Sequence, residues 1–138
     1  MLDLSAAARN HFEHPRNAGE LNADHPDVAA ALVGEPVSGA ILQLHLRIDE
    51  TGTIAAARFR AYGCGWTIAC GSLLTEIVQG RTLNEVMRFR HHELLEKLEV
   101  PPAKLTCAVL AETALKTALR AYATRPPPTA DLISFTQT

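Results

Sequence analysis

Two of the three cysteines in this chain stand where a thiol can be presented to solvent. Cys64 lies between Gly63 and Gly65, directly after a strand-like run and directly before a helix-like run. Because glycine lacks a Cβ and reaches unusual backbone angles, this pattern favours a loop apex with an exposed sulfur. Cys107 opens another helix-like segment. Two thiols at the ends of elements are typical of sulfur or metal chemistry rather than of a disulfide.

Each cysteine also has a structural alternative, which the residues leave open. Thr106 is suited to be an N-cap, so Cys107 would lie in a first helical turn, where free N–H groups lower the pKa of a thiol. Cys107 equally fits the first position of an apolar core stripe. Cys70 shares a stripe with Leu73, so we expect it to be buried, although a bent loop could bring it to Cys64. The glycines beside Cys64 could simply build a β-bulge.

The composition and the cysteine count indicate a small folded protein whose thiols stay reduced. Apolar residues make up 47% of the 138 residues and charged residues 20%, and the formal net charge is -2. No basic surplus suggests a nucleic-acid partner, and the apolar runs are far too short to cross a membrane. The first residues lack the pattern of a secretory signal, and three cysteines is an odd number. We therefore expect a cytoplasmic location with free thiols.

The pattern of apolar residues predicts an α+β fold with a small antiparallel sheet. Leu42, Leu44, Leu46 and Ile48 alternate with polar residues, and a turn at 49–52 leads to a second strand with Ala55, Ala57, Phe59 and Ala61 inward. Residues 22–33 are expected to form a loop with a little helix. A third strand is expected to complete the sheet.

The second half of the chain is expected to be helical. Helices are predicted over 67–79, from the capping box at 82–85 to about 90, over 92–98, and from 107 to about 122. A weaker helix is predicted over 4–12. These helices would pack on one face of the sheet within a single domain at 1–125. Pro126 to Pro128 then begin a tail at 126–138, which we expect to be disordered.

No sequence motif suggests enzymatic turnover. The six histidines show no metal-ligand spacing, and no phosphate loop or Ser/His/Asp elbow is present. We therefore expect a protein that is not an enzyme.

Taken together, these residues make the chain similar to the IscU/NifU-type scaffold proteins of iron–sulfur cluster assembly. Four segments carry the likeness, in the same order and at similar spacing: 14–19, 34–40, 58–65 and 101–112. The resemblance spans about residues 4–122. It implies a small antiparallel sheet with helices on one side, and a transient 2Fe–2S cluster, iron, or zinc in its place, bound by three cysteines with an aspartate or histidine.

The resemblance also assigns roles to residues and partners. Cys64 and Cys107 match two metal ligands, and Cys107 matches the sulfur acceptor that carries a persulfide. Pro101, Pro102 and Lys104 match a partner-binding segment. The implied partners are a cysteine desulfurase that supplies sulfur, a heat-shock ATPase chaperone that assists release, and apo iron–sulfur proteins that receive the cluster.

The chain departs from the family pattern at four positions. Ser38 replaces the first ligand cysteine, Ala40 an aspartate, Thr106 a histidine, and Val100 the leucine of the chaperone-binding segment. A serine hydroxyl keeps its proton at neutral pH unless a metal removes it, so one monomer offers two strong ligands where a cluster needs about four. Cys70, Ser38, or the thiols of a second copy in a homodimer are the alternatives for the remaining positions.

Three functional hypotheses follow from this comparison. The first is a scaffold or carrier that holds iron and sulfide on Cys64 and Cys107 for transfer to apo-proteins. The second is a sulfur relay that passes persulfide through Cys107 without holding iron. The third is a non-catalytic binding module that engages a cysteine desulfurase.

Overall fold

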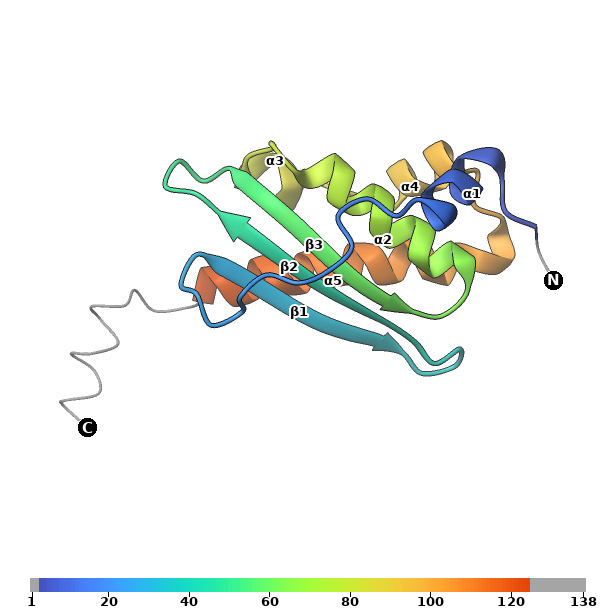
Figure 1. The fold of residues 1–138 in the computed structure, drawn as a ribbon, viewed down its shortest axis with the longest axis horizontal. Helices are drawn as coiled ribbons and strands as arrows, with labels where there is room; N and C mark the ends of the chain where they lie inside the picture. Colours follow the sequence, from blue (N-terminus) through green and yellow to red (C-terminus); the bar gives the residue numbers. More distant parts are fainter. Residues whose placement is uncertain (1–2, 125–138) are drawn as a thin grey trace.

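The computed structural model describes residues 3–124 as a three-stranded antiparallel sheet with helices on one face (Figure 1). In chain order the elements are α1 (Ala6–Glu13), β1 (Val28–Glu35), β2 (Ala40–Ile48), β3 (Ile54–Tyr62), α2 (Gly65–Val78), α3 (Leu83–Met87), α4 (His92–Leu98), the 3₁₀ turn η1 (Pro102–Lys104) and α5 (Leu105–Thr124). The predicted α+β fold is confirmed. The predicted tail at 126–138 lies outside the described residues. No helix within 3–124 is long and apolar enough to span a bilayer.

The β2–β3 hairpin forms where the alternation predicts it. Leu42, Leu44 and Leu46 are buried beneath the helices, and Gly52 supplies the positive φ of 81° that the turn requires. The inward assignment of Ala55 is wrong. The pairing shifts between Arg47 and Ile48, so Ala55 is the extra residue of a β-bulge and is exposed.

Residues 28–33 form a strand and not the predicted loop. β1 pairs with residues 40–47 of β2 in antiparallel register, from Val28 opposite Arg47 to Glu35 opposite Ala40. The run of alanines has weak strand propensity, which is why the sequence suggested a loop. Two of its small side chains, Ala29 and Ala31, are buried where α5 packs on β1, with Ala29 fully so. Tertiary packing therefore overrides local preference in this segment.

Two long helices cover the sheet. α5 packs on β1 and β2, and α2 packs on β3 and beside α5. The α2 helix approaches β3 at Gly71, where an added Cβ would lie 2.7 Å from Cδ2 of Phe59. The β1–β2 turn, the start of α2 and the start of α5 lie at the same end of the molecule (Figure 1). This arrangement places Ser38, Cys64 and Cys107 at one end of the fold.

The α1 helix is hydrogen-bonded to both α4 and α2 near the same end. Ser5 caps α1 by accepting a hydrogen bond from the Ala8 amide, and its hydroxyl donates to the carbonyl of Leu98. The buried ring of His11 shares a 2.7 Å hydrogen bond between its Nδ1 and Oγ of Ser72 in α2. These contacts hold the first turn of α1 beside the loop that carries Cys64.

Candidate functional site: a pair of thiols

The structure brings Cys64 and Cys107 together although 43 positions separate them in sequence. Cys64 is the N-cap residue of α2, and Cys107 lies in the first turn of α5. Their Sγ atoms are 3.9 Å apart, and both contact Oγ1 of Thr67, at 3.7 Å for Cys64 and 3.5 Å for Cys107. Both thiols are free. Two sulfurs at this separation can bind the same ion or exchange a sulfur atom.

The glycines on either side of Cys64 permit close packing around its loop. Gly63 has a φ of 156°, and a Cβ there would lie 2.9 Å from Oγ1 of Thr67. A Cβ on Gly65 would lie 3.2 Å from the Leu4 side chain. Both positions therefore favour glycine, one for its backbone angle and one for space. Cys64 itself is exposed, as the sequence predicts.

Local hydrogen bonds make Cys64 the more acidic of the two thiols. Partial burial by itself raises the pKa of Cys64, but hydrogen bonds from the Thr67 amide and hydroxyl, from the Trp66 amide and from Cys107 outweigh it. They lower the pKa of Cys64 from 9.0 to about 7. The N-terminal amides of α2 thus stabilise a thiolate at its own N-cap.

Of the two alternatives for Cys107, the structure supports the position in the apolar core stripe of α5, and Thr106 is not the N-cap that the sequence suggested. The 3₁₀ turn η1 runs directly into α5, so Thr106 is inside the helix rather than at its cap. Cys107 is only 7% exposed, and burial, together with the neighbouring Cys64, raises its pKa, although Thr67 and Lys104 act in the opposite direction. Desolvation of the charged form exceeds what the helix terminus offers here.

Cys70 is part of the core. It is fully buried in α2, and burial strongly raises the pKa of its thiol. The expected burial is therefore confirmed. The structure does not place Cys70 in the cavity that Cys64 and Cys107 line.

A cavity of about 520 Å³ opens beside the two thiols. Ser38 and Ala40, from the β1–β2 turn, line it together with Thr106 and Lys104, so the cavity gathers three of the positions where the chain departs from the family pattern. Pro102 starts the 3₁₀ turn that carries Lys104, and Pro101 caps that turn. Within residues 3–124, no three His, Cys, Asp or Glu side chains are arranged to hold a metal ion.

The sequence analysis missed Glu35, whose carboxylate also lines this cavity. Its oxygens accept hydrogen bonds from the amides of Val37 and Ser38, at 2.9 and 2.8 Å. A hydrogen bond from the Ser38 side chain, together with these amides, lowers the pKa of Glu35. The sequence could have identified Glu35 as a residue of the site, because it is the one acidic residue in the segment 34–40. It orders the turn that presents Ser38.

Comparison with known proteins relates this site to a family. Residues 5–128 match the family described as the NifU-like N terminal domain. The chain is 45% identical over 113 residues to the iron–sulfur cluster assembly scaffold protein IscU of Azotobacter vinelandii, covering 82% of this chain and 88% of that protein. It is 43% identical over 113 residues to iron–sulfur cluster assembly protein 2 of Arabidopsis thaliana, covering 82% and 69% respectively.

Solved structures share the fold. A NifU-like N-terminal protein from Brucella abortus aligns with a TM-score of 0.71 at 18% identity, over 88% of this chain and 95% of that chain. A protein from Fervidobacterium islandicum, described as a candidate iron–sulfur cluster assembly scaffold of the SUF system, aligns with a TM-score of 0.68 at 18% identity, over 83% and 95%.

Proposed function

The chain belongs to the family of the NifU-like N-terminal domain, and from this membership we propose that it acts as an iron–sulfur cluster assembly scaffold or carrier. Cys64 and Cys107 hold iron and sulfide during assembly, and the cluster then passes to apo-proteins. The relatives that match most of the chain are named scaffold proteins of this process.

The distance between the two sulfurs carries the proposal. Two thiolates bound at about 2.3 Å to one tetrahedral ion lie about 3.8 Å apart. The Sγ atoms of Cys64 and Cys107 are 3.9 Å apart, close to that separation. They lie beside an open cavity, so iron and sulfide can reach them. The pair is therefore spaced to chelate a single iron.

The cargo we propose is a transient 2Fe–2S cluster, with zinc able to occupy the same thiols. A cluster of this kind takes four protein ligands, and this monomer offers two thiols. The remaining ligands then come from Ser38 or from outside the monomer, including a second copy. Sulfur would be supplied by a cysteine desulfurase, and a heat-shock ATPase chaperone would engage the segment with Pro101, Pro102 and Lys104. The cytoplasm, where thiols stay reduced, is the proposed location.

Anaerobic reconstitution with iron and sulfide tests the scaffold proposal. We expect the wild type to retain a brown absorbing species after desalting, and Cys64→Ser and Cys107→Ser to lose it. Cys70→Ala is the matched cysteine control and should retain the colour. Ser38→Cys should retain more cluster than the wild type, because a third thiolate then lines the cavity. A wild type that stays colourless under every reconstitution condition would exclude the scaffold role.

A sulfur relay is the second candidate, and the proximity of an acidic and a buried thiol favours it. The thiolate of one cysteine attacks the outer sulfur of a persulfide on the desulfurase, which releases the desulfurase thiolate. The new persulfide can then pass its outer sulfur across the 3.9 Å to the other cysteine. Mass spectrometry after incubation with desulfurase and cysteine should show a gain of one sulfur on Cys107, by way of Cys64. An unmodified pair would rule out the relay.

A further inference from the structure

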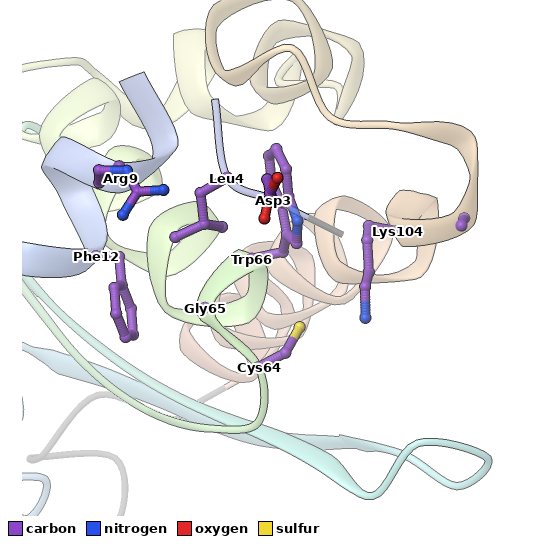
Figure 2. A pocket seen from close by; sticks show the side chains of 9 residues that line it. Asp3, Leu4, Arg9, Phe12, Cys64, Gly65, Trp66 and Lys104 are labelled. Carbon is purple, nitrogen blue, oxygen red and sulfur yellow. The ribbon is translucent and has the colours of Figure 1, made fainter. Parts of the chain in front are cut away.

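A second cavity, of about 660 Å³, adjoins Cys64 at the start of α2 (Figure 2). Its wall is built from α1, the segment before it, the start of α2 and η1. Cys64 and Lys104 line both this cavity and the smaller one beside Cys107. Its volume is within the range of small-molecule sites. A ligand bound here would therefore lie next to Cys64.

The charges in this cavity favour an elongated anion. Figure 2 shows Arg9 on one side of the cavity, and Lys104 together with Cys64 on the other. Asp3 is the one carboxylate in the lining. Leu4 and Phe12 add apolar surface to the lining, with Leu4 between the two cations in Figure 2, and Phe12 is 42% exposed. Cations at both ends of an apolar surface suit a molecule with a carboxylate at each end.

The indole of Trp66 adds an unused hydrogen-bond donor. Trp66 lines the cavity and is only 2% exposed, and its Nε1 is buried without a hydrogen-bond partner among the described residues. A buried donor without an acceptor is unfavourable, because it has lost its hydrogen bonds to water, and such groups are rare in native structures. The carbonyl of a peptide-like ligand would satisfy this N–H.

The cargo has coordination positions left for a further sulfur ligand. Iron in a cluster prefers thiolate, and this monomer contributes only Cys64 and Cys107 to the site. We propose that the Arg9–Trp66–Lys104 cavity binds a small peptide-like thiol with a carboxylate at each end, whose sulfur lies beside Cys64 and completes the ligands of the cargo. This inference rests on the proposed scaffold function. On coordination the ligand thiol releases its proton to solvent, and no electron is transferred.

Disulfide exchange on the apo-protein tests the cavity without any cluster. Oxidised glutathione serves as the anionic probe and 2-hydroxyethyl disulfide as the neutral one. The Cys64 thiolate attacks either disulfide, forms a mixed disulfide and releases one thiolate, which mass spectrometry detects on the Cys64 peptide. We expect Arg9→Gln and Lys104→Gln each to slow modification by glutathione disulfide about tenfold, the loss expected for one charge-assisted hydrogen bond. The neutral disulfide should react at an unchanged rate with Arg9→Gln.

Arg120→Gln is the matched control, since Arg120 is an exposed arginine on α5 that does not line this cavity. It should react like the wild type with both disulfides. Arg9 is also exposed, so its replacement leaves the core intact. Equal slowing of both probes by Arg9→Gln, or no slowing of either, would overturn the inference.

Reconstitution in different thiols separates this inference from the scaffold function. We expect the wild type to retain more cluster with reduced glutathione than with 2-mercaptoethanol, and Arg9→Gln to remove that advantage. Equal retention in both thiols would reject the ligand site and leave the scaffold role standing. If no thiol gives a cluster, the scaffold role fails, and with it the part of the inference that concerns the cargo. The disulfide assay then still decides whether the cavity selects anionic thiols.

Discussion

Cys64 and Cys107 are neighbours, yet their environments act on them in opposite directions. Cys64 sits at the open end of α2, where amides and the Thr67 hydroxyl point at its sulfur. Cys107 also begins a helix, but its sulfur is buried and faces a second thiol that shares the same proton-donating hydroxyl. Position at a helix terminus is therefore not sufficient to make a thiol acidic. The exposure of the sulfur decides between the two.

The first prediction concerns the pH dependence of Cys64. Because its pKa is lowered to about 7, the rate of alkylation by iodoacetamide should rise with pH and reach half its maximum near pH 7. Thr67→Val removes the hydroxyl that stabilises the thiolate and should move this midpoint to higher pH. Peptide mass spectrometry of quenched samples gives the rate at Cys64. Thr113→Val, on the exposed side of α5, should not change the midpoint, and a wild-type midpoint near 9 would contradict the assignment.

At the scale of elements, the site depends on how closely the helices approach the sheet. Gly71 of α2 faces the ring of Phe59 on β3 so closely that there is no room for a methyl group. This contact sets how closely α2 approaches the sheet. It thereby also sets the position of Cys64, which lies at the start of α2. The alanines of β1 have the same effect on α5 and Cys107.

Replacing Gly71 by alanine tests this packing. Helix propensity alone predicts that Gly71→Ala stabilises α2 by about 1 kcal/mol. Because the new Cβ would lie 2.7 Å from a buried ring, we expect overpacking of about 1–3 kcal/mol to prevail and the protein to lose stability. Urea denaturation measures the change. The same substitution in a Phe59→Leu background should be less harmful, and a stabilised Gly71→Ala single variant would refute the argument.

The attachment of α1 to α2 should depend on pH through His11. Burial, with help from Arg16, lowers the pKa of His11 below 6.5, while Glu76 opposes the shift. The folded structure therefore favours the neutral ring of His11. The contribution of this ring to the free energy of unfolding is complete above pH 6.5. It is lost as the pH falls below that value, because the unfolded chain takes up the proton more readily.

Thermal unfolding between pH 7.5 and pH 5.5 measures this effect. We expect the melting temperature of the wild type to fall more steeply with decreasing pH than that of His11→Gln, whose amide can still bond to Ser72. His14→Gln, an exposed histidine one turn away, is the control and should follow the wild type. Identical slopes for wild type and His11→Gln would show that His11 does not report on the docking of α1.

For the molecule as a whole, the thiol pair connects segments that are far apart in the chain. Cys64 follows the sheet and begins α2, whereas Cys107 begins α5, the last helix described. An ion held by both sulfurs would link two helices, and residues of the β1–β2 turn line the cavity beside it. Binding at this site should therefore stabilise the fold globally rather than locally.

Zinc offers a simple measurement of this coupling. At a free zinc concentration one hundred times the dissociation constant, a ligand specific for the folded state adds about 2.7 kcal/mol to the free energy of unfolding. We expect zinc to raise the melting temperature of the wild type and of Cys70→Ala, and to leave Cys64→Ser and Cys107→Ser almost unchanged. An equal rise in all four proteins would indicate that zinc binds elsewhere.

Local patterns in the sequence were sufficient for most of the elements. Three patterns appear in the structure as predicted: the leucine alternation of β2, the capping box at Thr82 and the long apolar stripe of α5. Each of them involves residues within a few positions of one another. The glycine pair around Cys64 likewise marked an exposed thiol, since backbone freedom and lack of Cβ are properties of the residue itself.

Tertiary structure alone decided the remaining features. Four features depend on groups contributed by distant segments. They are the 3.9 Å distance between the sulfurs, the strand at 28–35, the bulge at Ala55, and the opposite directions in which the pKa values of Cys64 and Cys107 are shifted. Burial and electrostatic environment are sums over whatever packs around an atom, so they exist only once the chain has folded. The sequence indicated two thiols at the ends of elements, whereas the fold brought them together and formed two cavities that Cys64 lines.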